Sequence, residues 1–518
     1  MRRLIAAPVV ALLLLTLNPG TAKAEPARTQ GLSGADTRVL NQYAADTWKS
    51  MDAMLFRETG LVADYIGGDL TPASRSRYTS PTNIGGYMWS AVVARDLGLI
   101  SRREAADRIG KTLQTLQRLE RHPASGMFYN WYDPLNGAKI RTWPDDGSPR
   151  NPFLSSVDNG WLAAALVVVR NVVPEQRSKA AAILSKMDFG FYYNPDARGN
   201  GLPGLIRGGF WDEEPLTPPE CNVVGNYRDR GPDVFYTCNH YDITVTEPRI
   251  ASYLGIAFGQ IPREHYFATN RTFPASCDWS WLEQQPTGVT RNYLGVPVYE
   301  GAYEYRGIKF VPSWGGDMFE ALMPDLFVPE DHWGPRSWGR NHPATVRGQI
   351  EHGMNDAKYG YWGFSPASNP FGGYGVYGVE AMGMDPGGYP SDKEGTNYDP
   401  GFGTCRPPGP PVTYGDGVVT PHAVFLAMRY APRESVDTLA KLKRNLGAYG
   451  PGGFYDSVAV RSGTVARRHL SLDQAMVMGG LGNVLARENI RRAFSSPDIE
   501  RALRPLMAME EFSVPARQ

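Results

Sequence analysis

The sequence predicts an all-α protein with the architecture of an (α/α)6 toroid, a closed ring of helical hairpins with long aromatic loops. About a dozen segments have helical periodicity, and they follow one another in pairs. Strand patterns are few, such as 308–311, and no βαβ alternation indicates a parallel sheet. The pairs also lack the fixed short period of a solenoid. An elongated multi-domain helical array is the competing fold.

The clearest helical pattern lies at residues 102–119. Ser101 and Glu104 form a capping box, and Ile109, Leu113 and Leu116 recur at helical spacing. The same reasoning predicts further helices at 37–57, 84–97, 157–169, 175–187, 248–258, 317–326, 345–358, 421–428, 436–446, 473–486 and 497–506. The Pro-Gly-rich segment 401–412 is interpreted as a loop, because too little sequence follows it for a second core. We therefore expect one domain over 25–518.

The N-terminus has the three regions of a secretory signal peptide. Arg2 and Arg3 precede an apolar run over 4–17, and Ala22-Lys23-Ala24 offers a small-residue cleavage site before Glu25. Residues 1–24 are therefore expected to be removed. No later run approaches the roughly 18 apolar residues of a membrane helix. These features predict a secreted protein without a membrane span.

Four cysteines fit an oxidising compartment. Cys221, Cys238, Cys277 and Cys405 show no CxxC spacing, which favours two disulfides over a metal site. Among the three connectivities, pairing of Cys221 with Cys238 and of Cys277 with Cys405 is preferred.

Composition narrows the class of ligand. Lysine and arginine together number 53, as do aspartate and glutamate, so the formal net charge is zero and nucleic acid is an unlikely partner. The chain is rich in tyrosine (27), tryptophan (12), glycine (57) and proline (42), which indicates structured loops that carry aromatic rings. Such loops suit a neutral, hydroxyl-rich ligand such as a polysaccharide or oligosaccharide.

Several carboxylates lie where apolar helices begin. Glu247 lies in TEPRIASYLG, where Thr246 could cap the helix and an acid would meet the positive end of the helix dipole. Asp158 follows Ser155 at the third helical position, so capping and a pocket role are both open. Glu320 lies beside an apolar stripe, where partial desolvation would raise its proton affinity. Ser471 and Asp473 are interpreted as another helix cap.

Nine ordered motifs resemble the glycoamylase-like domain family. They are NIGGYMW at Asn83, FYNWYD at Phe128, SSVDNGWLAAAL at Ser155, TEPRIASYLGIAFGQIPREHYF at Thr246, SWGGDMFEALMP at Ser313, YWGFSPA at Tyr361, DGVVTPHAVFLAM at Asp416, GPGGFYDS at Gly450 and LSLDQAMVM at Leu470. This family includes endo-β-1,2-glucanases and the chain-processing domain of cyclic β-1,2-glucan synthases. The resemblance implies an (α/α)6 toroid and a site that cleaves or transfers glycosides.

The matched motifs nominate catalytic residues. Glycoside hydrolysis needs one protonated carboxyl group and one carboxylate that attacks or activates water. Glu247, which matches a glutamate of the family, is predicted to be the acid. Asp158 or Glu320 is predicted to be the base or nucleophile, and Glu380 is held in reserve.

Aromatic and polar residues near these motifs are candidates for substrate binding. Tyr87, Trp131, Trp211, Trp314, Trp362 and Tyr377 are predicted sugar platforms, with core packing as the alternative for each. Asp133 lies among aromatic residues in FYNWYD. Arg249 is predicted either to pair with a catalytic carboxylate or to brace a helix end.

Metals and cofactors have no support in the sequence. There is no HExxH motif, and no phosphate loop or nucleotide fingerprint is found. Three alternatives stay open. A hydrolase could instead cleave another neutral glycan of the cell envelope. A polysaccharide lyase could use Tyr241 with His240 and Asn239, and a non-catalytic glycan-binding protein would keep the aromatic platforms without needing the carboxylates.

Overall fold

The computed structural model describes residues 31–199, 201–215, 221–272, 284–384 and 414–516. The predicted signal peptide, the 401–412 segment, Cys277 and Cys405 lie outside these ranges. The α-helices are α1 (Gly34–Ala53), α2 (Pro81–Asp96), α3 (Arg102–Leu116), α4 (Ser156–Val172), α5 (Arg177–Leu184), α6 (Arg249–Ala257), α7 (Met318–Leu322), α8 (Glu330–Trp333), α9 (Trp338–Glu351), α10 (Pro421–Ala427), α11 (Pro432–Asn445), α12 (Ser471–Leu485), α13 (Asn489–Phe494) and α14 (Pro497–Met509).

All twelve predicted helices are found, with ends shifted by a few residues in most cases. Local chemistry explains the starts, since Ser101 accepts a hydrogen bond from Glu104 N at 3.1 Å and Ser155 accepts one from Asp158 N at 3.1 Å. The predicted 317–326 helix is shorter, because α7 ends before Pro324 and a 3₁₀ turn, η5 (Pro324–Leu326), follows. The predicted 345–358 helix begins earlier, as α9, and ends in a π turn, η6 (His352–Asp356).

The all-α prediction needs correction, because the loops between the helices form small antiparallel sheets. By sheet, the strands are β1 (Leu55–Phe56) and β2 (Leu61–Val62); β3 (Tyr65–Gly67) and β21 (Arg468–Leu470); β4 (Phe153–Ser155), β7 (Gly209–Trp211), β9 (Val234–Thr237) and β8 (Asn222–Gly225); β5 (Tyr193–Asn194), β6 (Leu205–Arg207) and β10 (His240–Tyr241); β11 (Thr287–Tyr293), β12 (Val296–Tyr305) and β13 (Ile308–Phe310); β14 (Ala367–Ser368) and β15 (Tyr374–Gly375); β16 (Val418–Val419), β19 (Ser457–Ala459) and β20 (Thr464–Ala466); β17 (Tyr449–Gly450) and β18 (Gly453–Phe454).

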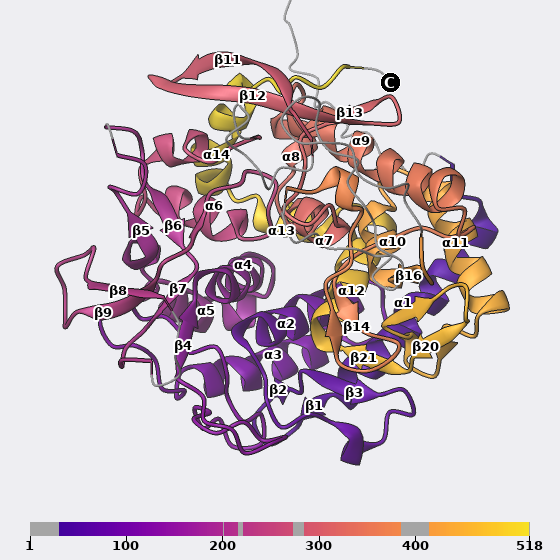
Figure 1. Cartoon of the computed structure of the whole chain (residues 1–518). Helices are drawn as coiled ribbons and strands as arrows, with labels where there is room; N and C mark the ends of the chain where they lie inside the picture. The colour runs from indigo at the N-terminus through magenta and orange to yellow at the C-terminus, as the bar shows by residue number, and fades with distance from the viewer. Residues whose placement is uncertain (1–30, 200, 216–220, 273–283, 385–413, 517–518) are drawn as a thin grey trace, which may run out of the picture.

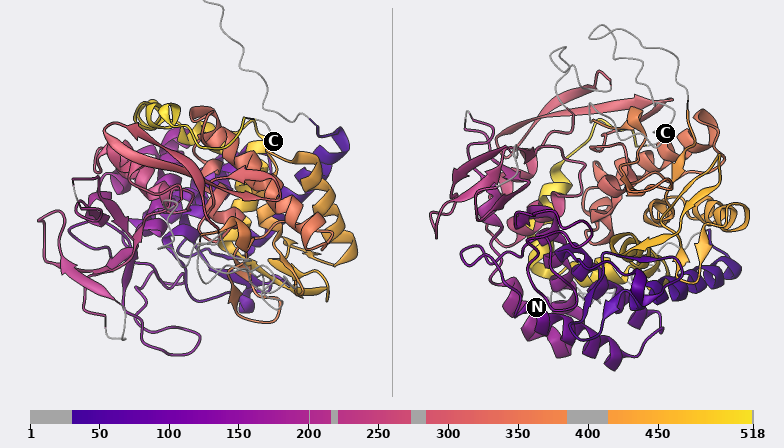
Figure 2. Two further views of the ribbon diagram at one scale, coloured as in Figure 1. Left: turned by 45° about the horizontal axis from the view of Figure 1, so that its top comes forward. Right: turned by 60° about the horizontal axis from the view of Figure 1, so that its bottom comes forward.

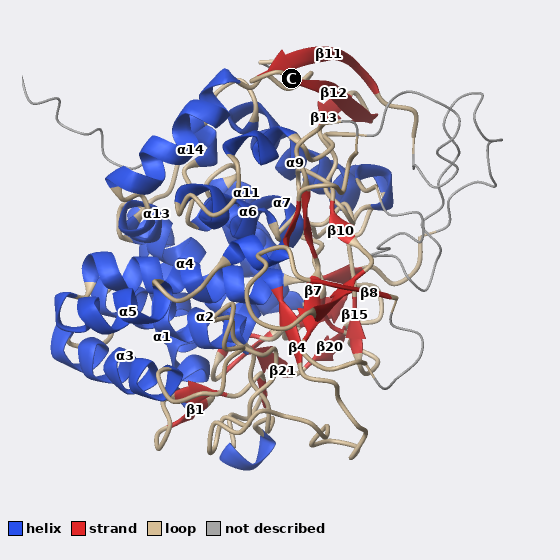
Figure 3. Ribbon diagram, turned by 90° about the vertical axis from the view of Figure 1, so that its left-hand side faces the viewer, coloured by secondary structure: helices blue, strands red, loops and turns tan. Residues whose placement is uncertain are grey.

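Most of these strands have two to four residues, too short to show an alternating pattern in the sequence. The exception is the β11–β12 hairpin, whose two-residue turn places Leu294 and Gly295 at φ of 53° and 85°. Most strands and loops gather on one side of the helical body (Figure 3).

The helices pack in two layers. In the inner layer, α2 packs on α4 and α12, α4 packs on α6, and α10 packs on α7 and α12. Arg249 of α6 donates to the carbonyl oxygens of Glu320 and Ala321 in α7, both at 2.7 Å. The contacts therefore run from α2 through α4, α6, α7, α10 and α12 back to α2. Chain order follows this path in Figure 1 as the colour passes around the molecule.

The outer layer covers these inner helices. The helix α1 packs on α12 and α2, α3 on α2, α5 on α4, α9 on α7, α11 on α10 and α14 on α6. The N-terminal (indigo) and C-terminal (yellow) parts of the chain lie side by side in Figure 2. The main apolar cluster includes residues from Leu40 to Val514, so both ends of the described chain share one core. In the part of the chain that the structure describes, no helix combines the length and the apolarity needed to cross a bilayer.

Candidate active site

Carboxyl groups gather where the inner helices begin. Asp158 lies in the first turn of α4, Glu247 precedes α6, Asp317 and Glu320 begin α7, and Asp473 lies in the first turn of α12. Asp64 and Asp456 join them from the loops. We call these seven residues the acid cluster. Asp317, Asp456 and Asp473 are buried, whereas the other four keep some exposure and therefore border solvent-accessible space.

Glu247 and Glu320 form the closest contact in the acid cluster. Glu320 Oε2 accepts hydrogen bonds from Glu247 N at 2.5 Å and from Thr246 Oγ1 at 2.7 Å. Glu247 Oε1 accepts one from Trp161 Nε1 at 2.5 Å. Burial, followed by the negative charge of Glu320, raises the pKa of Glu247 well above its usual range. Glu247 is thereby suited to hold a proton near neutral pH.

The predicted cap at TEPRIAS is wrong. The N-cap of α6 is Pro248, which makes no side-chain cap, and the Thr246 hydroxyl donates to Glu320 instead. The Glu247 carboxylate is therefore held by Trp161 of the neighbouring helix α4 and not by the first turn of α6.

Ser155 caps α4 at Asp158, as the capping interpretation predicts. The backbone N–H of Asp158 is capped by Ser155, while Asp158 Oδ1 accepts a hydrogen bond from Thr82 Oγ1 in α2 at 2.6 Å. Burial raises the pKa of Asp158. Nearby, Asp64 accepts from Asn83 Nδ2 at 2.7 Å, and burial with the charges of Asp158 and Asp456 raises its pKa to about 6.

A second group of acids was not identified from the sequence. Asp456 accepts a hydrogen bond from Ser368 N at 2.6 Å and shares another with Asp473. Burial and the charge of Asp456 raise the pKa of Asp473 well above its usual range. His422 Nδ1 lies 3.3 Å from Asp473 Oδ2, and burial lowers the pKa of His422 to about 3, so its ring is neutral.

These acids were missed for identifiable reasons. Asp456 lies in GPGGFYDS, a motif quoted for the family resemblance but not examined for acids. Asp473 was interpreted as part of a helix cap, yet α12 begins at Ser471 itself and has no side-chain cap. Asp473 lies in the first turn of an apolar helix, and the same feature had indicated Asp158 as a candidate.

Tyr374 reaches the acid cluster from a hairpin. Burial of its hydroxyl, followed by the charges of Asp473, Asp456 and Glu247, raises its pKa well above the usual range. The residue is nevertheless 58% exposed, and its neighbours Phe371 and Val376 are 55% and 44% exposed. Ser368, which begins the hairpin turn, contacts Asp456. The β14–β15 hairpin therefore presents an apolar surface beside the acids.

Four of the predicted sugar platforms are core residues. Tyr87, Trp211, Trp362 and Tyr377 are at most 6% exposed. Tyr87, for example, stacks on Trp48 and accepts a hydrogen bond from Arg108 at 3.2 Å. A ring without an exposed face cannot stack on a sugar, so these predictions are corrected. Trp131 and Trp314 keep partial exposure.

Arg249 and Asp133 have structural roles. Arg249 pairs with Glu330 through two hydrogen bonds of 2.7 and 2.9 Å and donates to three carbonyl groups, which confirms the bracing alternative. Asp133 accepts from Arg77 at 2.8 Å and from Leu135 N at 2.8 Å, which stabilises a turn, and its contact with substrate stays a prediction. Glu380 begins η7 (Glu380–Met382). This turn lies near Asp317, because Val379 N donates a hydrogen bond of 3.0 Å to Gly316 O.

One buried group has the composition of a metal site. Ligand atoms of Asp325, Glu330 and His342 lie within 4.8 Å of one another. Arg249 already pairs with Glu330, and Arg491 lies 3.2 Å from Asp325. These arginines supply the positive charge that a cation would bring, so the group is an ion-pair network that joins α6, α8 and α9.

The raised pKa of Asp64 predicts how stability changes with pH. The folded state binds this proton more tightly than the unfolded chain, so its stabilisation is complete below about pH 4 and is lost as pH rises through about 6. We expect the free energy of unfolding of Asp64→Asn, relative to that of the wild type, to rise by on the order of 1–3 kcal/mol when the pH is raised from 4.5 to 7.5. Denaturant unfolding at both pH values measures it. Asp437→Asn, at an exposed position on α11, is the control. If Asp64→Asn and the wild type differed in free energy of unfolding by the same amount at both pH values, this account of Asp64 would be contradicted.

Together, the circuit of contacts between inner helices and the acid cluster at their N-terminal ends define a helix-rich protein with a candidate acid–base site. Residues 291–496 match the family model described as "Putative glucoamylase", so this part of the chain is glycoamylase-like, and the resemblance found in the sequence is confirmed there. Residues 42–192 match a family described as "Protein of unknown function (DUF3131)".

Relatives extend the match along the chain. The chain is 26% identical to the cyclic beta-(1,2)-glucan synthase NdvB of Rhizobium meliloti over 89% of its own length, but spans only 18% of that relative. Its structure is similar to an endo-beta-1,2-glucanase from Chitinophaga pinensis, with a TM-score of 0.61 and 16% identity over 92% of this chain and 98% of that one. A beta-1,2-glucanase from Parabacteroides distasonis gives a TM-score of 0.62 and 14% identity over 91% and 60% of the two chains.

Proposed function

We propose that the protein is a secreted glycoside hydrolase that cleaves a neutral glucan, acting as an endo-β-1,2-glucanase. The observation that carries this proposal is Glu247, a partly exposed carboxyl group whose pKa is strongly raised by burial and by the neighbouring acids Glu320 and Asp158. The relatives named above, whose names specify β-1,2-glucan, support the substrate. An (α/α)6 toroid is the fold that we infer from the circuit of six inner helices and their outer partners.

In the proposed mechanism, Glu247 donates its proton to the glycosidic oxygen. The charge of Glu320 disfavours ionisation of Glu247 and so keeps the proton in place. Because Glu320 contacts the backbone of Glu247, it lies on the same wall of the site and is poorly placed to act from the opposite face of the sugar.

The second carboxylate must act from another direction. The charges of Asp456 and Glu247 both raise the pKa of Tyr374, after its burial, which supports assigning these two groups to one site. Burial raises the pKa of Asp456, whereas hydrogen bonds with Asp473 and Ser368 favour its ionised form. We therefore assign Asp456 as base or nucleophile and Asp158, in the first turn of α4, as the second candidate for that role.

Secretion has one structural support. Cys221 and Cys238 form a disulfide, as the preferred pairing predicts. Disulfides persist in oxidising compartments such as the extracellular space. The lyase alternative gains no support, because His240 and Tyr241 pair with β6, and burial lowers the pKa of His240 to about 4.

The test is product analysis on a panel of purified glycans. The mature protein is expected to shorten linear β-1,2-glucan to saturated oligosaccharides detected by mass spectrometry. Cleavage of a different neutral glucan would replace the substrate but keep the hydrolase. Unsaturated products from an acidic glycan, or binding without turnover of any glycan, would refute the proposed function.

Tyr374 should contribute to substrate binding. Its exposed ring beside the acid cluster offers a surface for a sugar face. We expect Tyr374→Ala to lower kcat/KM about tenfold, mainly through KM, and Tyr374→Phe to retain most of the activity. Val224→Ala, at a position that is also 58% exposed, is the control. Unchanged kinetics in Tyr374→Ala would remove the hairpin from the site.

A further inference from the structure

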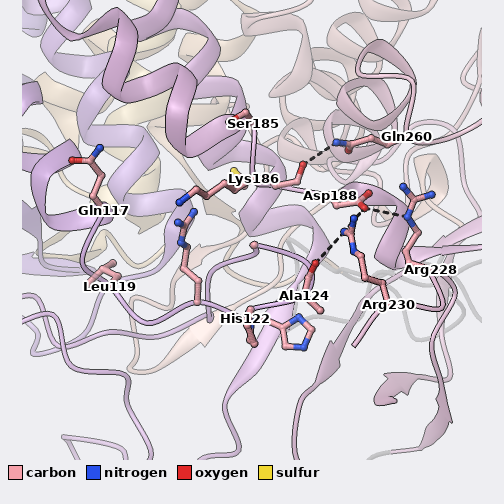
Figure 4. A pocket seen from close by; sticks show the side chains of 14 residues that line it. Gln117, Leu119, His122, Ala124, Ser185, Lys186, Asp188, Arg228, Arg230 and Gln260 are labelled. Carbon is pink, nitrogen blue, oxygen red and sulfur yellow. Dashed lines mark hydrogen bonds and ion pairs between the residues drawn. The ribbon is translucent and has the colours of Figure 1, made fainter. Parts of the chain in front are cut away.

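A second cavity lies outside the acid cluster. It has a volume of about 610 Å³ and is lined by the ends of α3 and α5, the 121–126 loop and the connection between β8 and β9 (Figure 4). No residue of the acid cluster lines it.

The lining of this cavity is strongly cationic. It contains Arg121, Lys186, Arg228 and Arg230 but only one carboxylate, Asp188. Asp188 Oδ2 already accepts from Arg228 Nε at 3.1 Å and from Arg230 Nη2 at 2.7 Å. The positive charge of Arg121 and Lys186 is therefore uncompensated, in a chain whose formal net charge is zero.

Arg121 provides a second, independent sign of a ligand. Its Nη1 atom is buried and has no hydrogen-bond partner in the described structure. The Arg121 guanidinium lies over the Phe128 ring, 5.0 Å from its centroid, but this contact supplies no hydrogen-bond acceptor to Nη1. A buried donor without an acceptor is costly to maintain, and a bound acceptor would remove that cost. Guanidinium groups bind carboxylates and phosphates through parallel hydrogen bonds, so the missing partner fits an oxyanion.

The cavity is also held in shape before any ligand arrives. Asn226 Nδ2 donates to the carbonyl groups of Arg230 and Pro232 at 3.0 Å each, which fixes the connection between β8 and β9. Gly126 has φ of 68°, and a Cβ there would lie 1.9 Å from Lys186 O. The 121–126 loop therefore packs directly against the chain at Lys186, just after α5.

We propose that this cavity is an oxyanion-binding site for a sugar that carries a carboxylate or phosphate group. The polar side chains of Gln117 and Ser185 complete a lining suited to a hydroxylated ligand. The site is independent of glucan cleavage, so its failure would not touch the proposed hydrolase.

Calorimetric titration of the mature protein tests the site. The probes are glucose 6-phosphate and glucuronate, with glucose as the neutral control. At least one anionic sugar is expected to bind, with glucose far weaker, and the preferred probe distinguishes a phosphate from a carboxylate site. The combined Arg121→Gln and Lys186→Gln variant should weaken that binding at least about tenfold, while Lys179→Gln, at an exposed position on α5, should not.

Two controls keep the test decisive. Lys186→Gln alone changes an exposed side chain, so it should fold normally and weaken binding by a smaller factor. Cleavage of neutral glucan should be unchanged in all three variants. The proposal is overturned if neither anionic sugar binds, if glucose binds as tightly, or if the Arg121→Gln and Lys186→Gln variant binds like the wild type.

Discussion

Replacing Glu247 with glutamine is expected to lower kcat on β-1,2-glucan by about 10²–10⁴-fold while leaving substrate affinity nearly unchanged. Glutamine keeps the shape of the side chain and can still interact with Trp161, but it has no proton to donate to the leaving oxygen. The measurement is the steady-state rate of product release, combined with binding of an oligosaccharide to the variant.

Two comparisons make this expectation specific. Asp456→Asn should also lose turnover, because it removes the proposed base, whereas Glu434→Gln, at an exposed position on α11, should retain full activity. In the wild type, activity should fall as pH rises through the raised pKa of Glu247, since the acid form is then lost. A Glu247→Gln variant that cleaves at the wild-type rate would exclude this residue as the acid.

The largest expected loss of stability comes from Arg249→Met. Arg249 and Glu330 are 5% and 0% exposed, and removing the guanidinium leaves Glu330 buried with an uncompensated charge. Three carbonyl groups would lose a donor as well. We expect unfolding in denaturant to show a loss of about 3–5 kcal/mol.

The partner substitution separates this explanation from simple loss of packing. Adding Glu330→Gln to Arg249→Met should recover part of the stability, because the buried carboxylate is gone. Arg103→Met, at a side chain that is 93% exposed, should cost little. If the double variant were less stable than Arg249→Met alone by the full cost of Glu330→Gln, the two side chains would not be coupled.

The helices could be predicted from the sequence because each has its own local signals. Ser101 and Ser155 cap, and the apolar positions that follow recur at helical spacing. The short strands could not be predicted in this way. β4, for example, has only three residues, and it is stabilised by β7, more than 50 positions further along the chain.

The site was predictable only in part. Glu247, Asp158 and Glu320 stood out because an acid beside an apolar helix is unusual, and the structure brings them together. Asp456 lies between the strands β18 and β19 rather than before a helix, so the search for acids beside apolar helices did not identify it. Exposure of aromatic rings was the least predictable property, because Tyr87 and Trp362 belong to motifs of the family yet face the core.

Product release from linear β-1,2-glucan, by the mature wild-type protein and Glu247→Gln side by side, tests the central claim most directly. The account predicts saturated β-1,2-linked oligosaccharides from the wild type and almost none from the variant, although the variant still binds the glucan. Equal product release by both proteins would contradict the assignment of Glu247, and binding without cleavage by either would contradict the hydrolase itself.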